Sequence, residues 1–198
     1  MDVSFDGAIV GMGTASGTRL VIGIWAASPF GPVADAMIER ADGERLLLAP
    51  TLEVADLIAA TYRFDTVRIE PVTLRPGTDE WHFESPSLDL TFRTGLRTGL
   101  GRLLTAVPRP LARSRVWCRA IDPVARRIRP GVRTAGTAGG GRREYYSALD
   151  EHRVVGLQAR LDGADLGALR PVAPPVRFGF GSAPVRPAIV RVTTRIVG

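Results

Sequence analysis

The residues best suited to acid–base chemistry lie at positions 150–152, where Asp150, Glu151 and His152 follow one another. A histidine oriented by a neighbouring carboxylate can act as a general base near neutral pH. Triad catalysis also needs a nucleophile, and only the generic candidates Tyr145 and Ser147 stand nearby. The favoured interpretation of this run is therefore a solvated turn between two strands, with His152 and Asp150 kept as catalytic candidates.

The other histidine and the single cysteine are weaker candidates for a catalytic role. His82 stands between Trp81 and Phe83 in an expected strand, so its side chain should point away from the face that carries both rings. Cys118 precedes Arg119, and a neighbouring cation lowers a thiol pKa and makes the thiol reactive. A small buried apolar residue is the favoured alternative for this cysteine.

Metal and disulfide chemistry have little support in the composition. Two histidines and one cysteine give too few soft ligands for a zinc-type site, and the carboxylates do not follow the spacing of a calcium loop. A single cysteine also excludes an intrachain disulfide. We expect no metal.

Two glycine-rich stretches resemble phosphate-binding motifs only in part. Gly11 and Gly13 are followed by Gly17, one place too late for a dinucleotide fingerprint, and the next residues read as a strand rather than a helix. The second stretch, residues 136–141, lacks the Lys-Ser/Thr ending of a P-loop. We therefore expect no cofactor.

Positive charge is concentrated in residues 93–143. This segment holds thirteen arginines and one acid, Asp122, so it carries +12 in a chain of net charge +6, and the remaining residues sum to −6. All 26 basic residues of the chain are arginine, as expected for a GC-rich coding sequence. The position of these arginines is therefore more informative than their type.

Three interpretations of this segment remain open. It can be a solvated face, or it can bind an anionic ligand or an acidic membrane surface, since a helix with leucine on one side and arginine on the other suits a lipid interface. It can also contact the phosphates of a nucleic acid. Nucleic acid is the least favoured partner, because Trp117 is the only aromatic residue of the segment that could stack on a base.

The N-terminal part of the chain predicts strands. Residues 1–50 alternate apolar and polar side chains between glycine, proline and Asp-Gly turns. In residues 18–27 both alternating sets are apolar, so this strand should be covered on both faces. The Asp-Gly turn at residues 41–44 predicts a hairpin between strands at 33–40 and 45–49.

Helices are expected in two places. Residues 51–62 change to helical spacing, with Val54 and Ile58 on one side. In residues 99–127 leucines recur three or four positions apart and prolines interrupt the pattern, which predicts helices that are broken or kinked. Residues 114–129 fit either a second helix or a strand.

Alternation returns in the remaining segments. Residues 66–75 and 88–93 alternate apolar and polar side chains, the latter most clearly. Residues 143–161 indicate paired strands, and residues 188–197 a final strand. The five glycines in residues 131–141 predict a loop.

Hairpin signals outnumber long crossovers, which predicts a mainly β (α+β) fold: an antiparallel barrel or sandwich with two or three helical inserts. In outline this architecture resembles lipocalin-type barrels, although no motif supports membership of that family. The chain should form a single domain, residues 1–198, with an Arg-rich helical or loop insert at about 93–143.

Composition also bears on the environment of the protein. An apolar content of 45% and a mean hydropathy of +0.07 are typical of a soluble globular protein. No apolar run approaches the roughly 20 residues that span a bilayer, and the N-terminus has no basic region before an apolar stretch. We expect a cytoplasmic protein.

The leading functional hypothesis is a non-catalytic protein that binds a small apolar or amphipathic, anionic ligand at the mouth of the barrel. The binding candidates are Arg143, Tyr145, Tyr146 and Trp117. One alternative is an enzyme that acts on such a ligand with His152 as base. The other is an adaptor that binds anionic lipid or nucleic acid through the Arg-rich segment. The oligomeric state cannot be read from the sequence.

Overall fold

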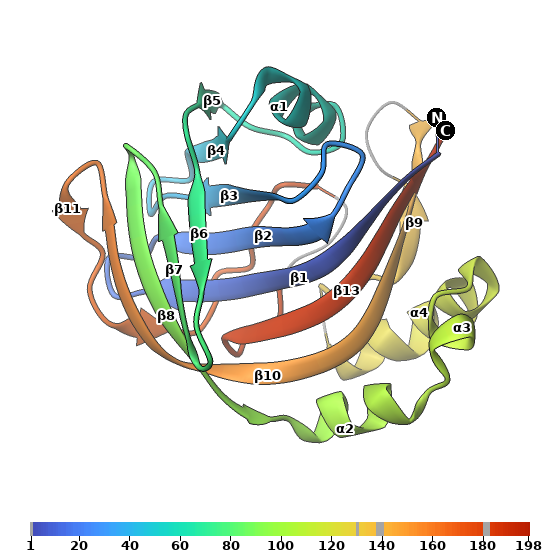
Figure 1. The fold of residues 1–198 in the computed structure, drawn as a ribbon. Helices are drawn as coiled ribbons and strands as arrows, with labels where there is room; N and C mark the ends of the chain where they lie inside the picture. The colour runs from blue at the N-terminus through green and yellow to red at the C-terminus, as the bar shows by residue number, and fades with distance from the viewer. Residues whose placement is uncertain (1, 130, 138–140, 180–182) are drawn as a thin grey trace.

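The computed structural model describes residues 2–129, 131–137, 141–179 and 183–198. Within them, one strongly curled sheet dominates the molecule, and four helices lie outside the curl (Figure 1). The strands are β1 (Asp2–Thr14), β2 (Arg19–Ala27), β3 (Val33–Glu39), β4 (Arg45–Ala49), β5 (Thr66–Ile69), β6 (Thr73–Pro76), β7 (Glu80–Glu84), β8 (Leu88–Arg97), β9 (Ala135–Thr137), β10 (Arg143–Leu161), β11 (Ala164–Asp165), β12 (Leu169–Arg170) and β13 (Ala188–Val197). The helices are α1 (Leu52–Ala59), α2 (Gly99–Ala106), α3 (Arg109–Ala112) and α4 (Arg115–Ile128).

The main path of the sheet runs β5-β4-β3-β2-β1-β13-β10-β8-β7-β6. The first and last long strands are therefore neighbours, with Val3 opposite Ile196 and Val10 opposite Ile189. Pairing is antiparallel except between β4 and β5, which are parallel because α1 connects them. The predicted mainly β fold with helical inserts is confirmed.

The expected closed barrel or sandwich is replaced by an open half-barrel. Strands β5 and β6 end the path of the sheet, and no pairing between them is present in the described residues. They are joined only by residues 70–72, where Pro71 has no N–H to donate to a ladder. The chain thus crosses between the two edges without strand pairing, and the lipocalin-like closure does not form. The Glu70 carboxylate links the two sides instead, because it accepts hydrogen bonds from the Ser87 amide at 3.2 Å and the Ser87 hydroxyl at 2.8 Å.

The interior of the curl holds the main core, to which both ends of the sheet contribute. Its fully buried members include Met12, Leu20, Ile22, Ile38, Leu46, Leu48, Phe83, Leu88, Leu90, Phe92 and Leu161. The outer face of β2, β3 and β4 is covered as well, by α1 and by a loop that carries Phe178. The expectation that residues 18–27 form a strand buried on both faces is confirmed for residues 19–24, whereas Ala26 and Ala27 at the end of β2 are exposed.

Residues 143–161 form one strand rather than the expected pair. Strand β10 is 19 residues long and its register shifts three times, the first between Ala148 and Asp150. Such bulges bend a strand, and β10 curves along the bottom of the sheet in Figure 1. It pairs with β13 along one edge, and with β9 and then β8 along the other.

The basic segment, residues 93–143, contains the helices α2, α3 and α4. Helix α2 begins at the N-cap Thr98, and α4 begins at the N-cap Ser114, whose hydroxyl accepts a hydrogen bond from the Trp117 amide. Of the two alternatives for residues 114–129, the helix is the one observed. The predicted loop contains the short strand β9, and positions 138–140 of that loop lie outside the described residues. All three helices of the insert pack against β10.

Candidate functional site

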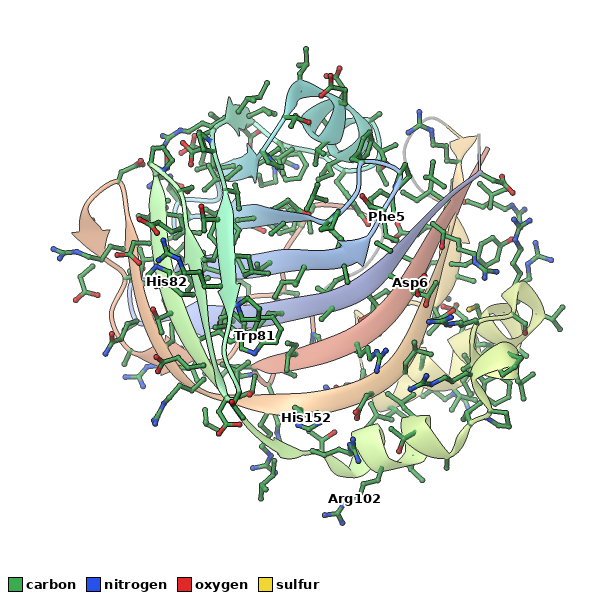
Figure 2. All side chains as sticks on the ribbon, in the orientation of Figure 1. Phe5, Asp6, Trp81, His82, Arg102 and His152 are labelled. Carbon is green, nitrogen blue, oxygen red and sulfur yellow. The ribbon has the colours of Figure 1, made fainter. Side chains whose placement is uncertain are left out.

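The concave face of the sheet opens into a groove of about 990 Å³. Apolar side chains from both ends of the sheet form its walls: Ala8, Ile24, Val72, Leu74, Trp81 and Ile189. Figure 2 shows the Trp81 ring in the mouth of the curl, and it stacks on the Phe92 ring with centroids 6.1 Å apart and planes 4° apart. Such a groove has the size and the apolar lining of a small-molecule site.

Charged residues occupy one end of this groove. The Arg97 guanidinium donates to both carboxylate oxygens of Asp150, with Nε 3.0 Å from Oδ1 and Nη2 3.0 Å from Oδ2. The His152 ring lies beside this pair, with Nε2 3.5 Å from Asp150 Oδ2 and Nδ1 3.1 Å from the Gly95 carbonyl oxygen. A carbonyl oxygen only accepts, so Nδ1 carries the proton of the neutral ring.

A smaller recess of about 170 Å³ continues from this end toward α2. Its charged residues are Arg97, Arg109, Asp150 and Arg191, and the groove shares all of them except Arg109. In the part of the chain that the structure describes, neither Arg109 nor Arg191 forms an ion pair. The recess therefore combines three guanidinium groups with one carboxylate.

A second ion pair lines the groove near Arg191, since Asp6 lies opposite Thr193 and Ala8 opposite Arg191. Arg113 Nη2 lies 3.1 Å from Asp6 Oδ1, which also accepts a hydrogen bond from the Thr193 hydroxyl. Because Asp6 neutralises Arg113 here, positive charge is in excess mainly around Arg191 and Arg109.

Of the residues nominated from the sequence, the groove brings together His152 and Asp150. Tyr146 lines a separate cavity on the other face of the sheet. Tyr145 is 4% exposed, and its hydroxyl oxygen accepts a hydrogen bond from Arg119. Arg143 is exposed at the start of β10, and Trp117 lies on α4. The four nominated ligand-binding residues thus do not share one cavity.

Sequence reasoning missed Trp81, Arg97, Arg109 and Arg191 as lining residues. The sequence did contain a pattern that could have identified Arg191 as a lining residue. The alternation in residues 188–197 places Arg191 on the same face of the strand as Ile189. Nothing in the sequence indicates that β13 lies beside β10, which is what brings Arg191 near Asp150.

The thiol of Cys118 is not activated by its surroundings. The residue is 1% exposed, and desolvation by burial raises the pKa of the thiol more than the Ser147 hydroxyl, 3.2 Å away, and Arg195 lower it. This favours the apolar, structural interpretation.

Two further features concern metals and membranes. The described residues contain no cluster of three or more histidine, cysteine, aspartate or glutamate side chains arranged to hold a metal ion. No helix among the described residues combines the length and the apolar character needed to cross a bilayer.

Comparison with known proteins finds similarity in fold alone. No family model matches the chain, and no curated protein matches it. The crystal structure of acetoacetate decarboxylase from Legionella pneumophila is similar over 99% of this chain and 84% of that chain, with a TM-score of 0.46 and 8% sequence identity. This likeness concerns the general course of the chain, and we draw no conclusion about activity from it.

Proposed function

We propose that the protein binds a small amphipathic anion, with the apolar part in the groove and the anionic group in the recess. One observation carries this proposal: Arg97, Asp150 and Arg191 line both spaces, so the apolar walls lead directly to a cationic end. A carboxylate or a phosphate ester on a hydrocarbon chain has this combination of properties.

The apolar walls supply the non-specific part of the affinity. Each methylene group transferred from water to such a surface contributes about 0.8 kcal/mol. The rings of Trp81 and Phe92 offer a flat, rigid surface, so the ligand loses little affinity to ordering of the protein.

The recess supplies the selection for an anion. Guanidinium groups form paired, charge-assisted hydrogen bonds with carboxylate or phosphate oxygens. Arg97 already donates to Asp150 through Nε and Nη2, so Arg191 and Arg109 offer more donors to a ligand than Arg97 does. The position of Arg97 and Arg109 within residues 93–143 supports a role for the basic segment at the mouth of the sheet.

Catalysis by His152 has weaker support from the same geometry. Arg97 contacts both oxygens of Asp150, and the distance of 3.5 Å from Asp150 to His152 is too long for a hydrogen bond. The sequence contains no lysine, so a lysine nucleophile is also excluded. Binding without chemical conversion therefore accounts better for these contacts.

The adaptor hypothesis also has weaker support. Five arginines of the basic segment form ion pairs with carboxylates: Arg97, Arg113, Arg115, Arg126 and Arg129. Five of the thirteen arginine charges of the segment are thus paired within the molecule, which reduces the charge that an acidic surface would recognise.

A titration with decanoate, below its micellar concentration, tests the proposal. We expect saturable binding with a change in tryptophan fluorescence, and a loss of about tenfold or more in affinity for Arg191→Gln, since a hydrogen bond to a charged group contributes about 1.5–3 kcal/mol. Arg153→Gln is the matched control, because Arg153 is exposed on β10 and is not among the residues that line the groove or the recess.

Decanol distinguishes the two halves of the site, since it has the chain without the charge. Its affinity should be the same for the wild type and for Arg191→Gln. An equal loss of decanoate affinity in Arg191→Gln and Arg153→Gln would show that the net charge of the protein, and not the recess, determines binding, and would contradict the proposal. Failure of decanoate, decyl phosphate and a naphthalene sulfonate to bind the wild type would refute the proposal.

A further inference from the structure

A second cavity, of about 120 Å³, lies on the face of the sheet opposite the groove. Adjacent residues of a strand point to opposite faces. Ile189 lines the groove and Val190 lines this cavity, and Ala8 and Ile9 are divided in the same way. The two spaces are therefore separated by the thickness of the sheet.

The walls of this cavity are mostly apolar. They include Ile9, Val21, Met37, Leu104, Val176 and Phe178, which come from the sheet, from α2 and from the loop that covers the outer face. Apolar cavities of about 150 Å³ in other proteins bind benzene. A single ring or a short aliphatic chain is therefore the size of molecule that this cavity suits.

Two buried carboxyl groups line this cavity, those of Glu144 and Glu151, and only Glu144 has an oxygen without a partner in the described part of the chain. Glu144 is 2% exposed, and its Oε1 accepts a hydrogen bond of 2.8 Å from the Tyr62 hydroxyl. Its Oε2 is buried and has no hydrogen-bond partner in the described part of the chain. Desolvation raises the pKa of Glu144 to about 7, although the Tyr62 hydrogen bond opposes this shift.

The other buried carboxylate of this cavity, that of Glu151, is satisfied by the protein itself. Glu151 Oε1 accepts hydrogen bonds from the Thr98 hydroxyl at 2.6 Å and from Arg129 Nη2 at 2.7 Å. The contrast identifies Glu144 Oε2 as an acceptor that is left for a group from outside the chain, because an unsatisfied buried acceptor costs about 1–3 kcal/mol.

Water alone would leave most of this cavity without a favourable contact. Tyr62, Arg129, Arg133, Tyr146 and Glu151 also line it and could serve as partners of a water, but the greater part of the lining surface is apolar. A molecule with an apolar body and one donor would contact the walls and satisfy the oxygen at the same time.

We propose that this cavity is a binding site for a small, mainly apolar molecule with a single hydroxyl group that donates a hydrogen bond to Glu144 Oε2. A monocyclic phenol or a short-chain alcohol has this chemistry. The site is separate from the groove, so it can be occupied together with the amphipathic anion proposed above.

Phenol and toluene test this proposal as a pair, because they have similar shape and only phenol has a donor. Measured by ligand-observed NMR at pH 8, phenol should bind the wild type saturably, at one site, and at least about tenfold more tightly than toluene. Glu144→Gln should reduce this preference about tenfold. The Tyr62 hydroxyl keeps the amide oxygen at the Oε1 position, so the amide nitrogen presents a donor, not an acceptor, to the cavity.

Two further variants make the result unambiguous. Val176→Phe places a larger ring in the cavity from the covering loop and should abolish binding of both molecules, whereas Arg191→Gln should leave both affinities unchanged. Absence of saturable binding by the wild type would overturn the proposal. An equal affinity for phenol and toluene, or a preference that persists in Glu144→Gln, would overturn it as well.

Discussion

Glu39 shows how a single buried residue can join two segments that are distant in the sequence. Its carboxylate has no exposed surface, and it pairs with Arg19 Nη2 at 2.8 Å and Arg177 Nη2 at 2.9 Å. It also accepts a hydrogen bond from the Arg177 amide at 2.7 Å. The carboxylate thus fixes the loop of the outer face to β3.

Glu39→Gln should lower the free energy of unfolding by about 3–5 kcal/mol, because Arg19 would remain buried without its counter-charge. Urea denaturation measures this change. Glu84→Gln is the control: it breaks the exposed Arg75–Glu84 pair and should cost less than about 1 kcal/mol. A similar effect of both substitutions would contradict the account of the buried pair.

Glu144 makes stability depend on pH. The pKa of this carboxyl rises from an ordinary value of 4.5 to about 7 in the folded protein, so the folded state binds more protons between these pH values. Its contribution to stability is fully present below about pH 4.5 and falls by about 3 kcal/mol as pH rises through 7, at about 1.36 kcal/mol per pKa unit. Asp35, with a pKa raised by burial to about 6, acts in the same direction.

Urea denaturation at pH 5 and at pH 8 measures this effect. The wild type should be less stable at pH 8, and Glu144→Gln should reduce the difference while Asp35 continues to contribute. A pH dependence that is unchanged in Glu144→Gln would contradict the burial of an ionisable carboxyl at this position.

Among the elements, α2 contributes to both proposed sites. Leu104 of this helix lines the recess and also the cavity on the other face of the sheet. Helix α2 lies very close to β10, since a Cβ on Gly101 would come within 2.3 Å of the Glu151 carbonyl oxygen. Its first turn is held by Thr98, which accepts a hydrogen bond from the Gly101 amide at 2.9 Å and donates one to Glu151 at 2.6 Å.

Thr98→Ala should therefore destabilise the fold by about 1–2 kcal/mol and weaken the binding of both decanoate and phenol. Thr98→Ser is the matched control, because serine keeps the capping hydroxyl, and it should retain most of the stability and binding. Thermal denaturation and the two titrations check this expectation. Loss of stability without any loss of binding would separate α2 from the sites.

Periodicity predicted the elements better than their partners. The alternation in residues 188–197 and 88–93 and the helical spacing in residues 51–62 correspond to β13, β8 and α1. The single long strand β10 was not predicted, because bulges between Ala148 and Asp150 break the two-residue period that identifies a strand.

The candidate site was predictable only in part. Asp150 and His152 were found because they are adjacent in the sequence. Trp81 and Arg191 are separated from them by many residues, and only the pairing of distant strands brings them into one groove. Local sequence patterns carry little information about such pairings.

At the scale of the whole molecule, the sheet stays open, and the proposed ligand would enter the groove from this side. Residues 70–72 cross between the two ends of the sheet without strand pairing, and the concave face holds a groove of about 990 Å³. The helical insert then brings arginines to one end of that groove.

Binding of decanoate should weaken as ionic strength rises, because the recess holds three arginines and a single carboxylate and lies partly open to solvent. Binding of phenol to the other cavity should be nearly independent of salt. Titrations at about 0.05 M and about 0.5 M salt, across which the screening length shortens severalfold, separate these cases. Salt-independent binding of decanoate would indicate that its charge lies outside the recess.

The most direct measurement is a crystal structure of the protein with decanoate. The account predicts that the hydrocarbon chain lies along Trp81 and that the carboxylate lies within hydrogen-bond distance, about 3 Å, of the Arg191 guanidinium. A carboxylate directed into solvent, or a decanoate bound only outside the groove, would contradict it.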